Sequence, residues 1–170
     1  VTANPSDRCY HCKNTLFRQI LRAAENDGFP VLLDGTNASD DAGDRPGMRA
    51  LRELSVRSPL RECGLTKAEI RRLSREAGLF TWDKPAYACL ATRIRTGEEI
   101  TLQKLKQTEK AEGFLFGLGF RDFRVRMVDN TAKLELRETD LPLLLENREK
   151  IVTELRKDYD SVLLNLEVRK

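Results

Sequence analysis

Two cysteines near the start of the chain, Cys9 and Cys12, stand three residues apart in the segment "DRCYHCK", with His11 between them. Thiols at this spacing can bind a metal ion or an iron–sulfur cluster, close a disulfide or carry out redox chemistry. The segment runs into a helical pattern of apolar residues that ends at an Asp-Gly pair. Both thiols are therefore expected in the first turn of a helix, near its positive end.

The composition limits what these thiols can do. The 170 residues are 40% hydrophobic and 34% charged, enough for the core of one domain or two small ones. Because 30 Lys and Arg are interspersed with 27 Asp and Glu, the net charge is only +3, and no basic block favours nucleic-acid binding. The sequence has neither the apolar run of roughly 20 residues that a membrane span needs nor a signal-peptide pattern. We expect a cytoplasmic protein with reduced thiols.

The first half of the chain alternates strand and helix patterns. The run "FPVLLDGTN", residues 29–37, predicts a strand buried on both faces of a parallel sheet, and "VRSPL" predicts another short strand. A helix over residues 66–79 begins at Thr66, with Glu69 at the capping-box position. Because ligands bind at the carboxyl ends of parallel strands, the loop after residue 33 is expected to face a ligand.

The second half has a different character. Residues 81–97 show no sustained periodicity, which favours an ordered linker or an active-site loop. Beyond them the patterns predict a helix over 101–119, a strand pair around a turn over 122–138, a helix over 139–159 and a strand over 161–168. The whole chain is therefore predicted to have an α/β fold, with a second, smaller α/β domain.

The segment "LLDGTNASDD" carries groups suited to a nucleotide. Asp34 and Asp40 could hold magnesium, Gly35 would let the backbone approach a ligand, and the Asn37 amide could bind a base or ribose edge. In isolation "DGTN" is more typical of an ordinary turn rich in Asx residues than of a nucleotide site.

Five segments in order resemble one family closely: "RCYHCK", "DGTNASDDAGDRPG", "SPL" followed by "LTKAEIRRLSREAGL", "KPAYACLATRI", and "FRVRM". They resemble the LarE family, the branch of the PP-loop ATP pyrophosphatases whose members transfer sulfur in building the nickel-pincer nucleotide cofactor. The resemblance runs from about Asn4 to the C-terminus. The family's Ser-Gly-Gly-x-Asp-Ser phosphate loop is absent from the sequence, so the resemblance implies that it belongs to a segment before Val1. We then expect this chain to bind AMP weakly and to hydrolyse no ATP.

The resemblance implies that the chain consists of three parts. Residues 1–80 would be the C-terminal part of the PP-loop domain, 81–97 the active-site linker with the donor cysteine, and 98–170 a small α/β substrate and oligomerisation domain. Implied ligands are ATP or AMP with Mg²⁺ and a pyridinium dicarboxylic acid mononucleotide; the implied assembly is a homo-oligomer, a hexamer in the family. The implied nucleotide-side residues are Asp34, Gly35, Asn37, Asp40 and Arg45.

Cys89 matches the cysteine of the family's "ACLxSR" motif, which displaces AMP from an adenylated carboxylate and leaves its sulfur as a thiocarboxylate. Arg93 follows four residues later, and a nearby guanidinium would favour the nucleophilic thiolate. The alternative is a buried structural cysteine, a common environment for free Cys. We assign Cys63, just before a helix, to structure.

The CxxC pair distinguishes two mechanisms within the family. Members with only the donor cysteine are sacrificial, whereas members with three cysteines hold a [4Fe-4S] cluster. The presence of Cys9, Cys12 and Cys89 thus implies a cluster with one iron open for an extra sulfide. Zinc held by the cysteines and His11 is the main rival, although simultaneous ligation by a histidine inside the CxxC is awkward. Free thiols are the third possibility.

The second domain supplies candidate anion and metal ligands. Arg124 and Arg126 alternate in "DFRVRMV", which places them on one strand face, where they suit a substrate phosphate. The resemblance also places phosphate-binding arginines here. Glu112 and Glu135 match positions where carboxylates of neighbouring subunits gather a divalent ion; composition alone would make them surface acids.

Two alternative functions stay open at this point. A PP-loop tRNA thiolase would also use three cysteines and a cluster, but the weak net charge and the lack of a basic, aromatic patch disfavour RNA binding. A zinc-stabilised interaction module would bind stoichiometric zinc and no nucleotide.

Overall fold

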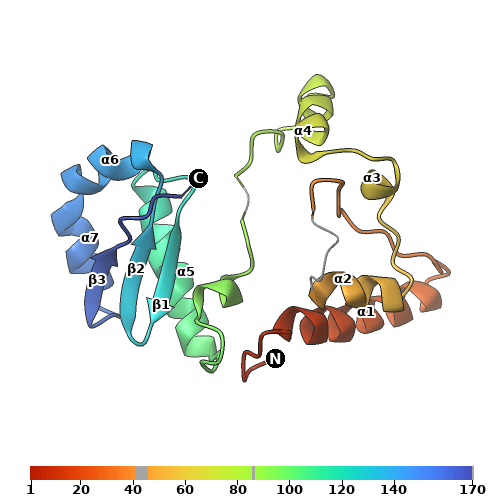
Figure 1. The fold of residues 1–170 in the computed structure, drawn as a ribbon, viewed down its shortest axis with the longest axis horizontal. Helices are drawn as coiled ribbons and strands as arrows, with labels where there is room; N and C mark the ends of the chain where they lie inside the picture. Colours follow the sequence, from red (N-terminus) through yellow and green to blue (C-terminus); the bar gives the residue numbers. More distant parts are fainter. Residues whose placement is uncertain (41–45, 86, 170) are drawn as a thin grey trace. The chain divides into compact units, whose positions relative to one another are not determined.

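The computed structural model describes residues 1–40, 46–85 and 87–169. The chain divides into two compact units (Figure 1). The first unit contains Pro5–Lys84, and the second contains Pro85–Lys170 together with Thr2–Asn4. In the described ranges, no helix combines the length and the apolar character that crossing a membrane would require.

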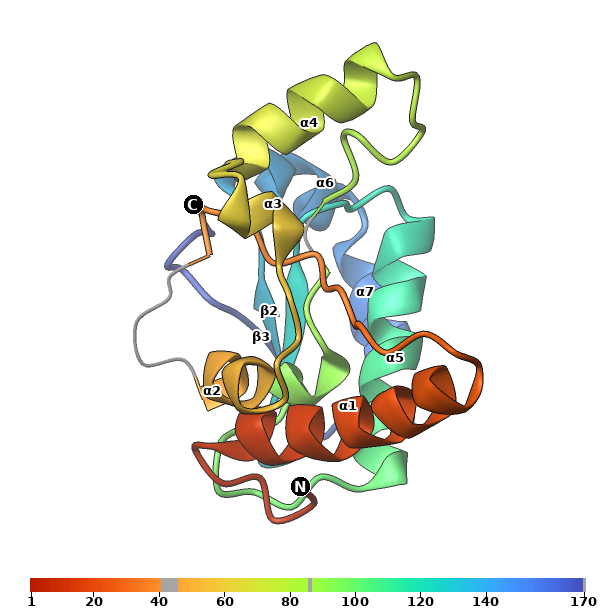
Figure 2. The ribbon, with the colours of Figure 1, turned by 90° about the vertical axis from the view of Figure 1, so that its right-hand side faces the viewer.

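Helices build the first unit: α1 (Arg8–Asn26), α2 (Pro46–Glu53), α3 (Pro59–Glu62) and α4 (Lys67–Glu76). Helices α1 and α2 lie side by side in Figures 1 and 2. Tyr10 of α1 joins them, because its hydroxyl donates a hydrogen bond to Glu53 (2.7 Å) and the Arg49 guanidinium stacks 3.8 Å from its ring centroid. The helix expected around the CxxC pair is confirmed, with Cys9 in its first turn and Cys12 in its second.

Helix α4 begins as the sequence predicts. The Thr66 hydroxyl accepts a hydrogen bond from the Glu69 backbone N–H at 3.3 Å, and the Glu69 carboxylate accepts one from the Thr66 backbone N–H at 2.8 Å. These reciprocal bonds form a capping box, which satisfies two backbone donors that the first helical turn leaves free.

The strand predicted over residues 29–37 is wrong for the described chain. Only an isolated parallel bridge joins Leu33 to Arg57, and Phe29, Val31 and Leu33 are 68%, 56% and 60% exposed. A strand buried on both faces needs hydrogen-bonded neighbours along its length, and the described residues supply a single point of pairing. The second expected strand, "VRSPL", likewise gives only the bridge at Arg57 before α3 begins.

The second unit contains a sheet with helices on one face. Strand β1 (Arg124–Val128) pairs antiparallel with β2 (Thr131–Glu135), which pairs parallel with β3 (Ser161–Leu164). Helix α5 (Leu102–Gly117) contacts β1 and α7 (Arg148–Leu155); α7 also contacts β3, so both helices lie on the same side of the sheet (Figure 2). The predicted strand pair, the final strand and the α/β class are confirmed.

The helix predicted over 139–159 is divided. The chain forms a 3-10 turn η2 (Glu138–Asp140), then α6 (Leu141–Glu146) and α7. Asn147 stands between α6 and α7, and its side-chain amide donates to the Leu143 carbonyl at 3.0 Å. A carbonyl in the last turn of α6 thus receives its hydrogen bond from a side chain. This favours the end of α6 at this point over a continuous helix.

The two faces of the sheet differ in chemistry. One face is buried against the helices in a core to which Val125, Met127, Ala132, Leu134, Leu115, Phe120, Ile151 and Leu155 contribute. By strand alternation, the opposite face carries Arg124, Arg126, Lys133 and Glu135. The charged residues of the predicted phosphate site therefore share one face of the sheet.

The linker before α5 is ordered along the outer edge of β1. It contains the 3-10 helix η1 (Leu90–Arg93), after which Ile94 forms an isolated parallel bridge with Met127. The Asn4 side chain donates to the Arg95 carbonyl at 2.7 Å, and the Gly97 backbone N–H donates to the Asn4 carbonyl at 2.9 Å. These contacts hold residues 94–97, and the role of residues 81–97 as a linker or an active-site loop stays a prediction.

Candidate functional site

Cys89 lies immediately before η1, and its thiol is free and exposed. The Cys89 carbonyl accepts two hydrogen bonds from Thr92, one from the backbone N–H at 2.9 Å and one from Oγ1 at 2.7 Å. Two donors on one carbonyl close the turn and fix the backbone that carries the thiol. Within this chain Cys89 does not have the buried environment of a structural cysteine. Cys63 is also exposed, at the end of α3.

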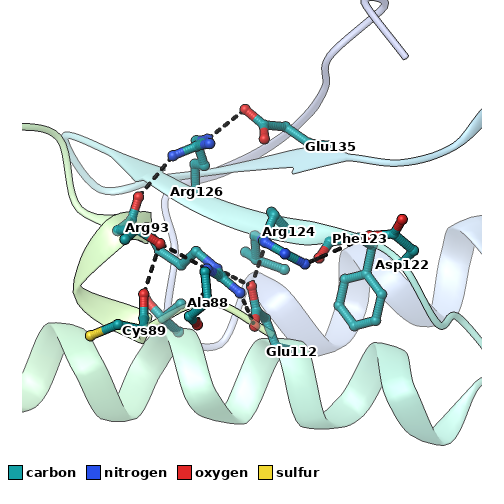
Figure 3. A network of polar contacts seen from close by, with 12 residues as sticks. Ala88, Cys89, Arg93, Glu112, Asp122, Phe123, Arg124, Arg126 and Glu135 are labelled. Carbon is teal, nitrogen blue, oxygen red and sulfur yellow. Dashed lines mark hydrogen bonds and ion pairs between the residues drawn. The ribbon is translucent and has the colours of Figure 1, made fainter. Parts of the chain in front are cut away.

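Arg93 lies beneath this turn and is 1% exposed. Its Nε and Nη2 donate to the two carboxylate oxygens of Glu112 at 2.6 and 3.0 Å. Its Nη1 donates to Thr92 Oγ1 at 2.9 Å and to the Ala88 carbonyl at 3.4 Å. Figure 3 shows the sulfur of Cys89 pointing away from this network. The guanidinium thus supports the backbone of the turn, and its effect on the thiol itself stays a prediction.

Glu112 projects from α5 and is 2% exposed. Besides the Arg93 guanidinium, its Oε1 accepts a hydrogen bond from the backbone N–H of Val125, on the outer edge of β1, at 3.0 Å. A buried carboxylate requires such a set of donors, because desolvation is costly. A divalent ion at Glu112 stays a prediction; in this arrangement the ion would have to compete with Arg93 and the Val125 N–H.

Arg126 and Glu135 form a second link to the turn. Arg126 Nε donates to Glu135 Oε1 at 2.6 Å, and Arg126 Nη1 donates to the Thr92 carbonyl at 2.8 Å (Figure 3). Arg126 thereby joins β1 to the end of η1. Glu135 also lies 3.9 Å from Arg169, so its predicted role at a divalent ion is untested while its observed role is pairing with arginines.

Arg124 lies among further positive charges. It is 8% exposed, and its Nη1 donates to the Phe123 carbonyl at 2.6 Å. Burial lowers the pKa of Arg124, and the positive charges of Arg93 and Arg169 lower it further, whereas the carboxylates of Glu112 and Asp122 oppose the shift. Binding of a substrate phosphate beside these guanidinium groups stays a prediction. Sequence reasoning missed Arg169, because its approach to Asp122 (3.2 Å) depends on the fold.

In the first unit, the Asp34 carboxylate holds the "DGTN" loop together. Its Oδ1 accepts from the Thr36 backbone N–H at 3.2 Å and from Ser58 Oγ at 2.6 Å, while Oδ2 accepts from Thr36 Oγ1 at 2.6 Å. Burial alone would raise the pKa of Asp34, but the hydrogen bonds from Ser58 and Thr36, with the positive charge of Lys13, hold it below its ordinary value. Magnesium binding by Asp34 stays a prediction.

The rest of this loop is built from Asx turns. The Asn37 backbone N–H donates to Asp40 Oδ2 at 3.0 Å, and the Ser39 backbone N–H donates to Asn37 Oδ1 at 3.0 Å. Gly35 is exposed. The geometry matches the ordinary-turn interpretation and leaves the nucleotide role untested. Arg45 lies outside the described residues.

Cys9 and Cys12 are exposed and free of disulfides. Cys9 and Lys13 from α1, Thr36 and Asp40 from the loop, and Gly47 from α2 line a pocket of about 300 Å³. His11 Nε2 lies 3.1 Å from Asp7 Oδ2. Within the described ranges, His, Cys, Asp and Glu side chains do not gather in any group of three or more that could hold a metal ion.

Comparison with known proteins gives relatives for much of the chain. No family model matches it. Over 135 residues it is 44% identical to an uncharacterized protein of Synechocystis sp., covering 79% of this chain and 50% of that protein. An uncharacterized protein of Methanocaldococcus jannaschii is 34% identical over 170 residues, covering 99% and 66%. The pyridinium-3,5-bisthiocarboxylic acid mononucleotide synthase of Lactiplantibacillus plantarum is 34% identical over 135 residues, covering 79% and 49%. The chain thus spans half to two thirds of the length of these relatives.

Proposed function

The chain belongs to the LarE family, that of the synthase just described, and from this premise we propose that it takes part in sulfur transfer during biosynthesis of the nickel-pincer cofactor. The main support for this proposal is Cys89. Its thiol is exposed and free of disulfides, and the turn that carries it is held by hydrogen bonds to the Cys89 carbonyl. A nucleophile that is accessible while its backbone is fixed suits attack on an activated carbonyl.

The proposed reaction starts from a pyridinium dicarboxylic acid mononucleotide. ATP with Mg²⁺ would adenylate one carboxylate and release pyrophosphate. The Cys89 thiolate then attacks the acyl carbon, a C–S bond forms, and the C–O bond to AMP breaks with its electron pair on AMP. In the sacrificial version, a base removes the Cα proton of residue 89, the Cβ–S bond breaks with its electrons on sulfur, and thiocarboxylate and dehydroalanine result.

The charged face of the sheet supplies a site for the substrate phosphate in this proposal. Arg124 has a pKa lowered by burial and by neighbouring guanidinium groups, and a bound anion would relieve their repulsion. Arg169 adds a buried Nε with no hydrogen-bond partner among the described residues. Arg126 is proposed to contribute while it holds the Thr92 carbonyl. In the first unit, the loop around Asp34, Gly35, Asn37 and Asp40 is proposed to contact AMP.

As an alternative to the sacrificial version, we propose a [4Fe-4S] cluster in which Cys89 would be a ligand and would keep its sulfur; the described residues do not bring three such ligands together. Cys9, Cys12 and Cys89 are all exposed and unpaired, and Cys9 and Cys12 stand at i and i+3 on α1, on one face of the helix. These three thiolates would hold the cluster. When bound, it would supply sulfide from its open iron, so that Cys89 would not be consumed.

Iron content tests the cluster. Anaerobically purified protein should be brown and hold about four irons per chain. Cys9→Ala, Cys12→Ala or Cys89→Ala should each abolish or destabilise it, whereas Cys63→Ala should not. Colourless protein that loses sulfur from Cys89 on turnover would establish the sacrificial mechanism instead, and stoichiometric zinc would support the rival metal.

Self-association is a further part of the proposal. Apolar side chains in and near β3 are exposed: Leu163 of β3 is 55% exposed, Leu166 after the strand 86%, and Leu145 of α6 71%. Exposed apolar groups of this kind suit contact with another copy of the chain. Light scattering should give a mass above that of one chain, and Leu166→Lys should lower it.

The transfer step can be measured apart from adenylation. With a chemically prepared acyl adenylate of the pyridinium substrate, Cys89→Ala should release AMP at least about 100-fold more slowly than the parent chain, because the nucleophile is gone. Cys63→Ala removes an exposed thiol outside the site and should keep the parent rate. Equal rates for Cys89→Ala and the parent would overturn the proposal.

A further inference from the structure

We propose that Glu112 is a positioning residue for the donor thiol, acting through Arg93 on the turn that carries Cys89. The inference rests on the proposed function, because it takes Cys89 as the sulfur donor. The path from carboxylate to thiol runs through hydrogen bonds of Arg93 and Thr92.

The contacts of Arg93 divide between two sides. Nε and Nη2 bind Glu112, and Nη1 reaches the turn, where it donates to the Ala88 carbonyl and to Thr92 Oγ1. Ala88 immediately precedes Cys89, and Thr92 Oγ1 donates onward to the Cys89 carbonyl. One guanidinium therefore restrains the backbone before the thiol and, through a hydroxyl, the backbone after it.

Glu112 decides whether Arg93 can stay in this place. Arg93 is 1% exposed, and a buried guanidinium without a counter-charge would move toward water and release both contacts to the turn. The carboxylate is itself fixed by its position on α5 and by the Val125 N–H of β1. Two regular elements of the core thereby determine the position of a thiol on a loop, which is how a reactive group is held in attacking geometry.

Glu112 and Arg93 also lie close to Tyr87, the residue before Ala88. Burial raises the pKa of Tyr87, and the neighbouring Glu112 carboxylate raises it further. The Arg93 guanidinium lies 5.5 Å from the Tyr87 ring centroid. The Glu112–Arg93 pair therefore reaches the chain on the N-terminal side of Cys89 through a second side chain.

Hydrogen exchange tests this role without substrate or sulfur transfer, so its outcome is independent of the proposed function. In Glu112→Gln, amides over residues 88–94 should exchange about tenfold faster than in the parent, while those of β2 and β3 keep their protection. Glu98→Gln is the matched control, because it removes the same charge from an ion pair with Lys104 in the same unit (3.6 Å). It should leave the 88–94 segment unchanged.

A second variant covers the case in which Glu112→Gln fails to fold. Thr92→Val keeps the shape of the side chain and the Glu112–Arg93 pair, but it removes the hydroxyl that joins Arg93 to the Cys89 carbonyl. Amide exchange over residues 88–94 should again be faster than in the parent, with little change in the denaturant midpoint of unfolding. With the acyl adenylate, both variants should lower the maximal single-turnover rate constant of AMP release more than they raise the adenylate concentration that gives half of it. Exchange that rises evenly through the second unit in Glu112→Gln, or stays at the parent rate in Thr92→Val, would overturn the positioning role.

Discussion

The two units support their thiols in different ways. Cys89 stands on a unit whose core contains Leu115, Phe120 and Val125, all fully buried. Cys9 and Cys12 stand on α1, which has no buried residue among those described, and whose Leu16 is 50% exposed. Within the described chain, the donor thiol is therefore supported by a buried core. The helix that carries the CxxC pair is held by surface contacts, such as the hydrogen bond from Tyr10 to Glu53.

Breaking one ion pair in each unit should give the largest difference in stability between the two units. Arg93→Ala leaves the Glu112 carboxylate buried without its counter-charge, and we expect it to lower the free energy of unfolding of the second unit by about 3–5 kcal/mol. Arg72→Ala breaks the exposed pair with Glu76 in the first unit and should cost within about 0.5 kcal/mol. Urea unfolding followed by hydrogen exchange separates the units. Similar losses for the two variants would contradict the comparison.

Truncating one apolar side chain in each unit tests the same difference in burial. Leu115→Ala should cost the second unit about 2–5 kcal/mol, because it removes a fully buried side chain and leaves a cavity. Leu16→Ala, on the exposed surface of α1, should change stability by no more than about 0.5 kcal/mol. The measurement is the denaturant midpoint of each variant. A large loss for Leu16→Ala would show that α1 is buried in solution.

Acid should loosen the "DGTN" loop of the first unit, a local and smaller effect. The folded-state pKa of Asp34 lies below its ordinary value of 3.8, so its contribution to stability is complete above that value and is lost as the pH falls through the folded pKa. The Thr36 amide resonance should shift in this range as its hydrogen bond to Asp34 weakens. In Asp34→Asn the shift should be absent; its persistence would assign the titration to another group.

Local signals in the sequence predicted much of the fold. The capping residues Thr66 and Glu69 and the alternation around Arg124 are short-range patterns, and the structure confirms the helix and the strand pair that they predict. The strand at residues 29–37 failed because strand formation depends on partners elsewhere, which an apolar run does not specify.

In the candidate site, too, local patterns indicated some residues, and only the fold revealed the others. The family resemblance implied Cys89, and the four-residue spacing added Arg93. The pairing of Arg93 with Glu112 joins residues 19 positions apart through the packing of η1 on α5, which no local pattern shows. Glu112 looked like a surface acid because composition does not reveal burial. Arg169 escaped notice because its approach to Asp122 arises only when the C-terminal segment returns to the sheet.

Direct trapping of the acyl group on Cys89 tests the central claim. After the chain is mixed with the acyl adenylate and quenched in acid, peptide mass spectrometry should find the pyridinium acyl group on Cys89 as a thioester, with AMP released in equal amount. Glu112→Gln should form the same adduct more slowly. An acyl group found on Cys9, Cys12 or Cys63 while Cys89 stays unmodified, or AMP released with no adduct and no thiocarboxylate, would contradict the assignment of Cys89 as the sulfur donor.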